Sequence, residues 1–430
     1  MKVISWATGR GSEGEVVTTT ASREARPGRR RSTPVGGPGA ADEELDPLGG
    51  RDLLEAVRAM RPELEGATLR AEEERTLPAD VVARFRDLGL FWLKTPAELG
   101  GRPLHPLAFA DLVEQVSYYD ASSGWAMMIG CGSTGIAAGR LSDEGAARIF
   151  SSPAGLPVVA GQPHAERGRA RRKRGGYVVT GRWGFASGVH HADWVLGAAQ
   201  VEGVEAGKPG SEFGFVAPKS DATVHDNWRV AGLQGTGSSD FSLDEVFVPK
   251  ELTYDRRAGI RRGGPLFHQE GVLFVGNEVP AISVGVATRA IDDMIAMVSD
   301  FRRSRGTSLV DRGVFHKELG QAKTRVDSVR LYYREAMNAG FQAATAGVPV
   351  PADVQRAAMV SQTYVSETCV DVVSNLFRYG GGRALSLSHP MQRHLRNLFA
   401  ARQHLAATEE HYEVLGRSLI EDWVARGNGQ

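Results

Sequence analysis

A short segment at residues 181–188 combines the residue types that a flat ligand with polar edges requires. Trp183 and Phe185 offer aromatic surface, and Ser187 offers a hydroxyl that can donate or accept a hydrogen bond. Gly188 allows the backbone to approach a ligand closely. A tight β-hairpin with a hydrophobic corner uses the same residues, so the segment alone leaves both interpretations open.

A second segment, at residues 235–238, has the sequence Gly-Thr-Gly-Ser. Its backbone N–H groups and the hydroxyls of Thr236 and Ser238 could bind a phosphate or the edge of a ring. A glycine-rich loop is also an ordinary connection between two strands. This segment, too, is ambiguous on its own.

His404 is the third candidate, because the pattern around it predicts a long helix lined by small side chains. At helical spacing its neighbours would be Ala400, Ala401, Ala407 and Thr408. Small neighbours would leave the imidazole in a space large enough for a ring. A lone histidine on a helix is nevertheless most often structural, and the sequence does not exclude that role.

The bulk composition excludes several classes of protein. The chain has 430 residues, of which 42% are hydrophobic, enough for two or three domains with sizeable cores. Lys plus Arg and Asp plus Glu both number 51, which argues against a nucleic-acid-binding protein. Cys131 and Cys369 form no disulfide framework, and the adjacent His190 and His191 would face opposite ways on a strand. We expect a cytoplasmic protein without a metal site.

Residues 1–48 are rich in Gly, Pro, Arg, Ser and Thr, and we expect a flexible tail that includes Arg29–Arg31. No stretch is apolar enough for a membrane span, and no secretory signal is recognisable at the start. The basic run at 167–174 is predicted to be a solvated hairpin turn, with docking of an anion as the alternative.

The order of elements along the chain is helices, then strands, then helices. We expect an N-terminal helical domain at 49–156, a small antiparallel β domain at 157–265 and a four-helix bundle at 266–430. The strands are expected at 158–160, 177–180, 194–196, 213–216 and 241–248. The bundle helices are expected at 270–303, 313–346, 352–378 and 388–424.

The segments at 181–188 and 235–238, in this order inside a β domain flanked by helices, resemble the acyl-CoA dehydrogenase family. Pro96–Gly101 and Gly380–Arg396 match loops of that family, and the resemblance covers about residues 50–425. It implies a multi-domain α+β fold: an N-terminal α-helical domain, a middle antiparallel β-barrel and a C-terminal four-helix bundle. It also implies flavin between the last two domains, and a homotetramer.

Within the family, the chain resembles the reduced-flavin-dependent, two-component monooxygenases (group D flavin monooxygenases). Many dehydrogenases of the family carry a catalytic glutamate where this chain has Leu405, or a second base near Val275. Neither residue can take a proton, although Glu278 lies one turn from Val275. In the monooxygenase branch a histidine faces the reactive edge of the flavin, and His404 matches it.

The resemblance implies a role for each candidate residue. His404 and Ser187 would be catalytic: Ser187 would bind flavin N5, and His404 a C4a-hydroperoxyflavin formed from reduced flavin and O2. The cofactor-binding residues would be Trp183, Phe185, Ser187, Gly188, Thr236, Ser238, Arg305, Gly381 and Gly382, and the substrate residues Trp125, Met128 and Ser133. Reduced FMN or FAD would diffuse from a separate flavin reductase, because no nicotinamide-binding Gly-x-Gly-x-x-Gly on a βαβ unit is present.

One departure from the pattern affects the choice of substrate. Ser133 stands where several relatives have a histidine, which weakens the prediction of a simple phenol. We expect a small aromatic natural-product intermediate, with N-oxygenation of an amine or amino sugar as the alternative. Two further alternatives are an acyl-CoA dehydrogenase with a relocated base at Glu278, and a silent flavin or acyl binder.

Overall fold

The computed structural model describes residues 46, 48–269, 272–305 and 309–427, without the side chains of 272, 273, 301–305 and 427. Nearly all of the predicted tail, including Arg29–Arg31, therefore lies outside the described residues. No helix in the described ranges is long and apolar enough to cross a membrane.

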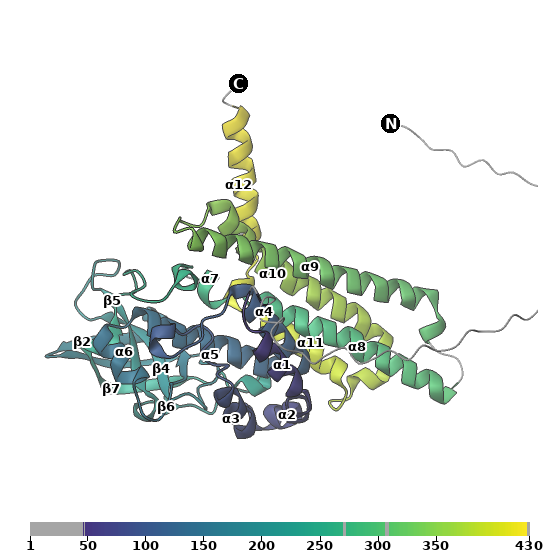
Figure 1. Ribbon diagram of the computed structural model, residues 1–430, viewed down its shortest axis with the longest axis horizontal. Helices are drawn as coiled ribbons and strands as arrows, with labels where there is room; N and C mark the ends of the chain where they lie inside the picture. The colour runs from purple at the N-terminus through teal and green to yellow at the C-terminus, as the bar shows by residue number, and fades with distance from the viewer. Residues whose placement is uncertain (1–45, 47, 270–271, 306–308, 428–430) are drawn as a thin grey trace, which may run out of the picture. The chain divides into compact units, whose positions relative to one another are not determined.

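Six α-helices precede the sheet in the part of the chain that the structure describes (Figure 1). They are α1 (Arg51–Ala59), α2 (Arg61–Glu74), α3 (Ala79–Asp87), α4 (Pro106–Tyr119), α5 (Ala121–Arg140) and α6 (Asp143–Phe150). Side-chain caps begin three of them: His105 Nδ1 accepts from Leu107 N–H at 3.1 Å, the Asp120 carboxylate from Ser123 N–H at 2.7 Å, and the Ser142 hydroxyl from Gly145 N–H at 3.1 Å. Both α4 and α5 are largely buried, so α5 can contribute side chains to an interior site.

The middle of the chain forms a mostly antiparallel sheet in the order β6-β7-β3-β2-β4-β5-β8, with β1 beside β4. The strands are β1 (Val159–Gly161), β2 (Gly168–Lys173), β3 (Gly176–Trp183), β4 (Trp194–Val201), β5 (Glu212–Pro218), β6 (Thr223–Val224), β7 (Phe241–Pro249) and β8 (Thr253–Tyr254). Two pairings, β1 with β4 and β2 with β4, are parallel.

The basic run at 167–174 is mostly the strand β2, and its prediction as a turn was wrong. Gly168 and Ala170 point into the core, whereas Arg169 and Arg171 are exposed. This two-residue alternation is what a half-buried strand requires. The turn itself is confined to Arg174 and the next residue.

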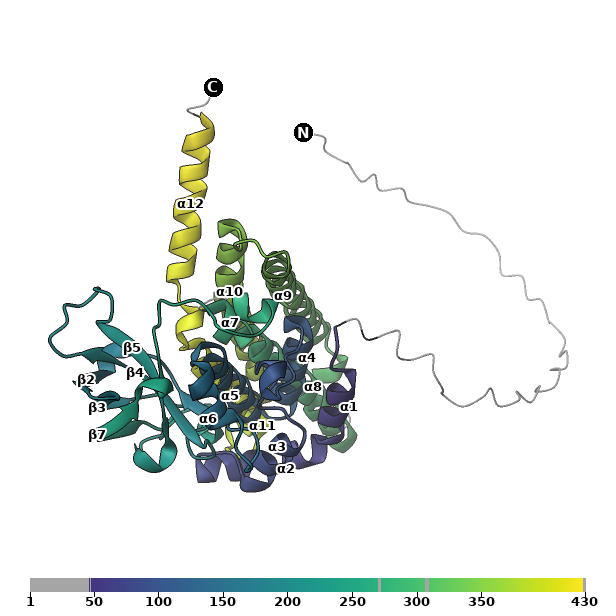
Figure 2. The ribbon, with the colours of Figure 1, turned by 60° about the vertical axis from the view of Figure 1, so that its left-hand side comes forward.

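The C-terminal part is a helix bundle whose helices are α7 (Val272–Val275), α8 (Val279–Arg305), α9 (Gly313–Thr345), α10 (Ala352–Phe377), α11 (Pro390–Arg402) and α12 (Glu410–Gly427). The first and last predicted helices are each divided in two. In the last, the helix ends at Arg402 and His404 adopts an extended conformation (φ −68°, ψ 142°) before a short 3-10 turn. Figures 1 and 2 show α12 extending away from the other bundle helices.

Side-chain capping explains why the helix does not continue through 404. The imidazole Nδ1 of His404 accepts from Ala406 N–H at 3.3 Å, and the Thr408 hydroxyl accepts from Glu410 N–H at 3.4 Å. Such local bonds compete with the helical backbone pattern. The prediction that His404 lies within a helix was therefore wrong.

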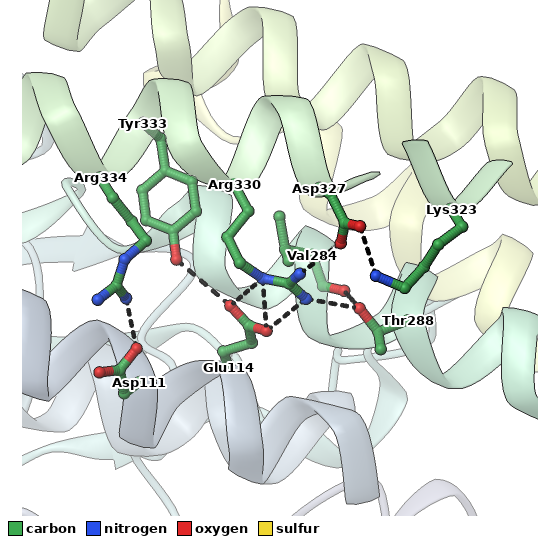
Figure 3. Close-up of polar contacts among 9 residues, drawn as sticks. All are labelled: Asp111, Glu114, Val284, Thr288, Lys323, Asp327, Arg330, Tyr333 and Arg334. Atoms are coloured by element: carbon green, nitrogen blue, oxygen red, sulfur yellow. Dashed lines mark hydrogen bonds and ion pairs between the residues drawn. The ribbon is translucent and has the colours of Figure 1, made fainter. Parts of the chain in front are cut away.

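A charged cluster joins α4 to the bundle helices α8 and α9 (Figure 3). The Arg330 guanidinium donates to Glu114 Oε1 from Nη2 at 2.7 Å and from Nε at 3.0 Å, and Nη2 also donates to Thr288 at 3.0 Å. Arg334 pairs with Asp111 one helical turn away. A fork of this kind fixes both distance and angle, so the cluster holds the N-terminal helices in register with the bundle.

Candidate active site

A cavity of about 980 Å³ lies where the helical and sheet regions meet. One wall is a single face of α5, formed by Trp125, Ile129, Ser133, Ile136 and Arg140. Their spacing of four, four, three and four residues is that of one helix face. The sequence analysis identified Trp125 and Ser133 and missed the other three, although this spacing from Trp125 would have found them.

A chain of hydrogen bonds closes one end of the cavity. Trp125 Nε1 donates to Ser187 Oγ at 3.2 Å, and Ser187 Oγ lies 2.8 Å from Ser238 Oγ. Ser238 Oγ lies 2.7 Å from Thr236 Oγ1, which donates to the Leu233 carbonyl at 2.9 Å. The segments at 181–188 and 235–238 thus meet, and Ser187, Thr236 and Ser238 all line the cavity.

The two aromatic residues of the first segment have different environments. Phe185 lines the cavity with 70% of its surface exposed, at a left-handed φ of 57°, and its ring contacts that of Trp228 edge-on at 6.2 Å. The Trp183 indole is instead fully buried in the sheet core, stacked on Phe241 at 5.1 Å, with Nε1 donating to Ala198 O. Trp183 and Phe185 both line the cavity, and Phe185 presents the exposed aromatic surface there.

Gly188 does not itself line the cavity, but its conformation requires a glycine. Its φ of 77° is left-handed, and a Cβ there would lie 2.8 Å from His191 Nε2. Its N–H donates to the Thr236 carbonyl at 2.9 Å, which binds the two loops together at the backbone level. A side chain at 188 would be strained and would push this junction apart.

His404 lines the cavity next to Trp125, with ring centroids 5.4 Å apart and planes at 81°. Burial lowers the pKa of His404 to about 4, so the imidazole is neutral at pH 7. Because Nδ1 accepts from Ala406 N–H, the single ring hydrogen of the neutral form is on Nε2. His404 is therefore a neutral hydrogen-bond donor, and its neighbour Leu405 also lines the cavity.

Glu278, the alternative base, is held in a buried ion pair. Its Oε2 lies 2.7 Å from Lys94 Nζ, and each side chain is only 1% exposed. Lys94 also donates to the Phe274 carbonyl, and its ammonium lies 5.2 Å from the centre of the Phe274 ring. Phe274 and Val275 line the cavity, whereas Glu278 does not. Glu278 fixes the cavity wall from behind, and Val275 is apolar as the sequence analysis noted.

Several predicted residues are not at the cavity. Met128 is fully buried in the helical core, on another face of α5. Gly381 and Gly382 are exposed in a 3-10 turn and do not line the cavity. The side chain of Arg305 lies outside the described part of the structure. Met128 was mispredicted because it is three residues from Trp125 but points away from the Trp125–Ser133 face.

At the other end of α5, two buried polar groups that line the cavity have no partner. They are the Tyr254 hydroxyl and the Gln269 side-chain nitrogen. Burial raises the pKa of Tyr254 to about 12, so its hydroxyl stays protonated. Arg140 lies beside this end, where it donates to the Ala258 carbonyl at 2.8 Å. The sequence analysis missed all three; the helical spacing from Trp125 marks Arg140, whereas no local motif marks Tyr254 or Gln269.

Comparison with known proteins yields matches over most of the chain. The models "Acyl-CoA dehydrogenase, N-terminal domain" and "Acyl-CoA dehydrogenase, C-terminal domain" match residues 51–144 and 279–409, together more than half of the sequence. Indole-3-acetate monooxygenase of Pseudomonas putida is 26% identical over 80% of this chain and 87% of its own length. The oxygenase component of an FADH(2)-dependent resorcinol hydroxylase of Rhizobium sp. is 29% identical, over 86% and 94%.

Among solved structures, the 3-HSA hydroxylase of Rhodococcus sp. RHA1 superposes with a TM-score of 0.77 at 23% identity, covering 85% of this chain and 96% of that one. This similarity shows the fold. The chain belongs to the acyl-CoA dehydrogenase family, in its branch of reduced-flavin-dependent monooxygenases.

Replacing Lys94 by methionine tests the buried ion pair. Lys94→Met leaves the Glu278 carboxylate buried without its partner, and we expect the free energy of unfolding to fall by about 3–5 kcal/mol in urea titrations. The double variant Lys94→Met/Glu278→Leu should recover most of this loss. Arg102→Met, which breaks the exposed pair with Asp52, should cost less than about 1 kcal/mol. An unchanged unfolding midpoint for Lys94→Met would show that the pair does not hold this wall.

Proposed function

We propose that the protein is the oxygenase component of a two-component system that oxygenates a small aromatic molecule. Reduced FMN or FAD diffuses from a separate reductase, and O2 is the co-substrate. One oxygen atom enters the substrate, the other leaves as water, and the reduced flavin supplies the two electrons. The observation that carries this proposal is the convergence of Ser187 and His404 on Trp125 inside one cavity.

The residues at this end of the cavity fit a flavin. Its volume of about 980 Å³ is at the upper end of ligand sites, as a cofactor together with a substrate requires. The exposed Phe185 ring suits the face of a planar ring, and the hydroxyls of Ser187, Thr236 and Ser238 suit its polar edge. Gly188 keeps the two loops that carry these hydroxyls in backbone contact. When bound, the flavin would activate O2.

The protein residues would orient and protect this chemistry. His404 would donate a hydrogen bond from Nε2 to oxygen and help to move a proton as the O–O bond breaks. Phe185 and Trp125 would exclude water, which limits wasteful release of hydrogen peroxide. Ser187 would bind the flavin at N5.

The remaining space along α5 favours an aromatic substrate over an amine. Ile129, Ile136 and Phe274 make apolar walls, and the unpaired donors of Tyr254 and Gln269 suit a carbonyl, hydroxyl or carboxylate oxygen. A cationic amine would need a free carboxylate. Among the described residues, two acids line the cavity: Asp240 is paired with Arg182, and Glu166 lies 3.3 Å from His164. N-oxygenation is thus the second candidate.

The dehydrogenase alternative lacks a base. Leu405 and Val275 line the cavity without a titratable group, and Glu278 is turned into the core toward Lys94. A thioester α-proton would therefore find no carboxylate at either of these two positions. The monooxygenase is therefore the function that this site supports best.

We also propose that the protein is a homotetramer. The helix α12 exposes Leu419, Ile420 and Trp423, the last with 71% of its surface accessible. A row of exposed large apolar residues on a projecting helix is typical of a protein–protein contact.

Replacing His404 by asparagine should lower oxygenation about 100-fold or more. Asparagine keeps an acceptor for Ala406 N–H but loses the Nε2 donor. The assay uses photoreduced FMN or FAD, O2 and a panel of indoles and phenols, including indole-3-acetate and resorcinol, with products followed by mass. The exposed His316→Ala variant is the control and should retain full activity.

The pH profile provides a second check on His404. Since burial lowers its pKa to about 4, the neutral donor persists above pH 4 and is lost only as the pH falls through that value. The oxygenation rate of the wild type should therefore show no change near pH 6.5 that results from protonation of His404. Undiminished oxygenation by His404→Asn would remove this residue from the mechanism.

Replacing Ser187 by alanine should raise the hydrogen peroxide released per product up to about tenfold, the effect of losing one buried hydrogen bond. Peroxide is measured with a peroxidase-coupled dye alongside product. Ser328→Ala removes an exposed hydroxyl on α9 that does not line the cavity and serves as the control. Equal peroxide release by Ser187→Ala and wild type would contradict the role of Ser187 at N5.

Replacing Trp423 by glutamate should dissociate the assembly. Light scattering of the full chain should give four times the chain mass for wild type and a smaller mass for the variant. Glu413→Gln, an exposed change on the same helix, should keep the wild-type mass. A monomeric wild type would refute the proposed tetramer.

A further inference from the structure

The hydrogen-bond chain at the end of the cavity has only one possible direction. It contains four bonds, which join Trp125, Ser187, Ser238, Thr236 and the Leu233 carbonyl in that order. Four hydrogens are available: one on the indole nitrogen and one on each hydroxyl. All four bonds form only if every hydrogen is used once.

The two ends fix the order in which the hydrogens are used. The Trp125 indole can only donate, and the Leu233 carbonyl can only accept. The Thr236 hydroxyl must donate its hydrogen to the Leu233 carbonyl, so it accepts the hydrogen bond from Ser238. Ser238 then accepts from Ser187, whose own hydrogen points away from the cavity.

We infer that Trp125, Ser238 and Thr236 are positioning residues that make Ser187 a hydrogen-bond acceptor toward its ligand, and so make the site select reduced over oxidised flavin. After accepting from Trp125, Ser187 keeps one lone pair and no free hydrogen. The three hydroxyl residues are at most 5% exposed, and an unmade bond at such a site is costly. The direction of the hydrogen bonds in this chain therefore stays the same when a ligand binds.

The consequence for flavin rests on the proposed function, in which Ser187 meets N5. Reduced isoalloxazine carries a hydrogen on N5 and can donate to Ser187. Oxidised isoalloxazine has a bare lone pair on N5, which would face the lone pair of Ser187. Ser187 thus pairs with one redox state and repels the other.

Binding of both redox states tests this inference without turnover. Dissociation constants of oxidised FMN and FAD are measured by fluorescence, and those of the photoreduced forms by anaerobic dialysis. We expect wild type to bind the reduced form at least about tenfold more tightly. A tenfold change in the ratio of the two constants corresponds to about 30 mV in the midpoint potential of bound flavin.

The variant Thr236→Val removes the end of the chain. Ser238 can then donate back to Ser187, which frees the Ser187 hydrogen for an acceptor. The ratio should fall about tenfold, mainly through tighter binding of oxidised flavin, with a matching fall in midpoint potential. Thr236→Ser keeps the hydroxyl and should restore the ratio, and Ser133→Ala should leave it unchanged.

If Thr236→Val does not fold, Ser238→Ala frees the same hydrogen by deleting its acceptor. A wild-type ratio near one, or a ratio that neither variant changes, would overturn the inference and leave flavin binding intact. Failure of wild type to bind either redox state would refute the proposed function itself.

Discussion

The buried ion pair between Lys94 and Glu278 is the constraint on which the cavity depends. Two opposite charges at 1% exposure are tolerated only when each satisfies the other, so the loop after α3 and the start of α8 cannot separate. Lys94 also binds the Phe274 carbonyl, which extends the constraint to α7. The wall formed by Phe274 and Val275 is thus held from the side opposite the cavity.

Small residues on α5 allow that wall to come close. A Cβ at Gly135 would lie 2.8 Å from the Phe274 ring, and one at Gly132 would lie 3.3 Å from a methyl of Val275. The ion pair holds Phe274 and Val275 in place, and the absence of side chains at Gly132 and Gly135 allows them to pack against α5. The cluster around Arg330 and Glu114 then fixes α4 against the bundle (Figure 3), so that the cavity is bounded by elements that do not shift independently.

Much of the fold and part of the site could be predicted from sequence, because short-range patterns determine them. Strand alternation and the order of elements depend on such patterns, whereas the joint role of the segments at 181–188 and 235–238 was implied by the family resemblance. The break at His404 could not be predicted, because the apolar spacing continues across it and only the capping geometry interrupts the helix. The extent to which Trp183 is buried in the sheet core could not be predicted either, because aromatic residues in a strand serve a core as readily as a ligand. Tyr254 and Gln269 reach the cavity through tertiary contacts alone.

Phe185 shows what this arrangement means for ligand capture. A non-glycine residue with φ of 57° costs roughly 1–2 kcal/mol, and its ring is left largely in water. Both penalties are incurred during folding, before any ligand arrives. The Phe185 ring is therefore already oriented for binding before the ligand arrives. Binding of a planar molecule then costs little conformational entropy of the protein. Such preorganisation would suit the reduced flavin that we propose as the cofactor, because a reduced flavin reacts with oxygen in bulk water unless it is bound quickly.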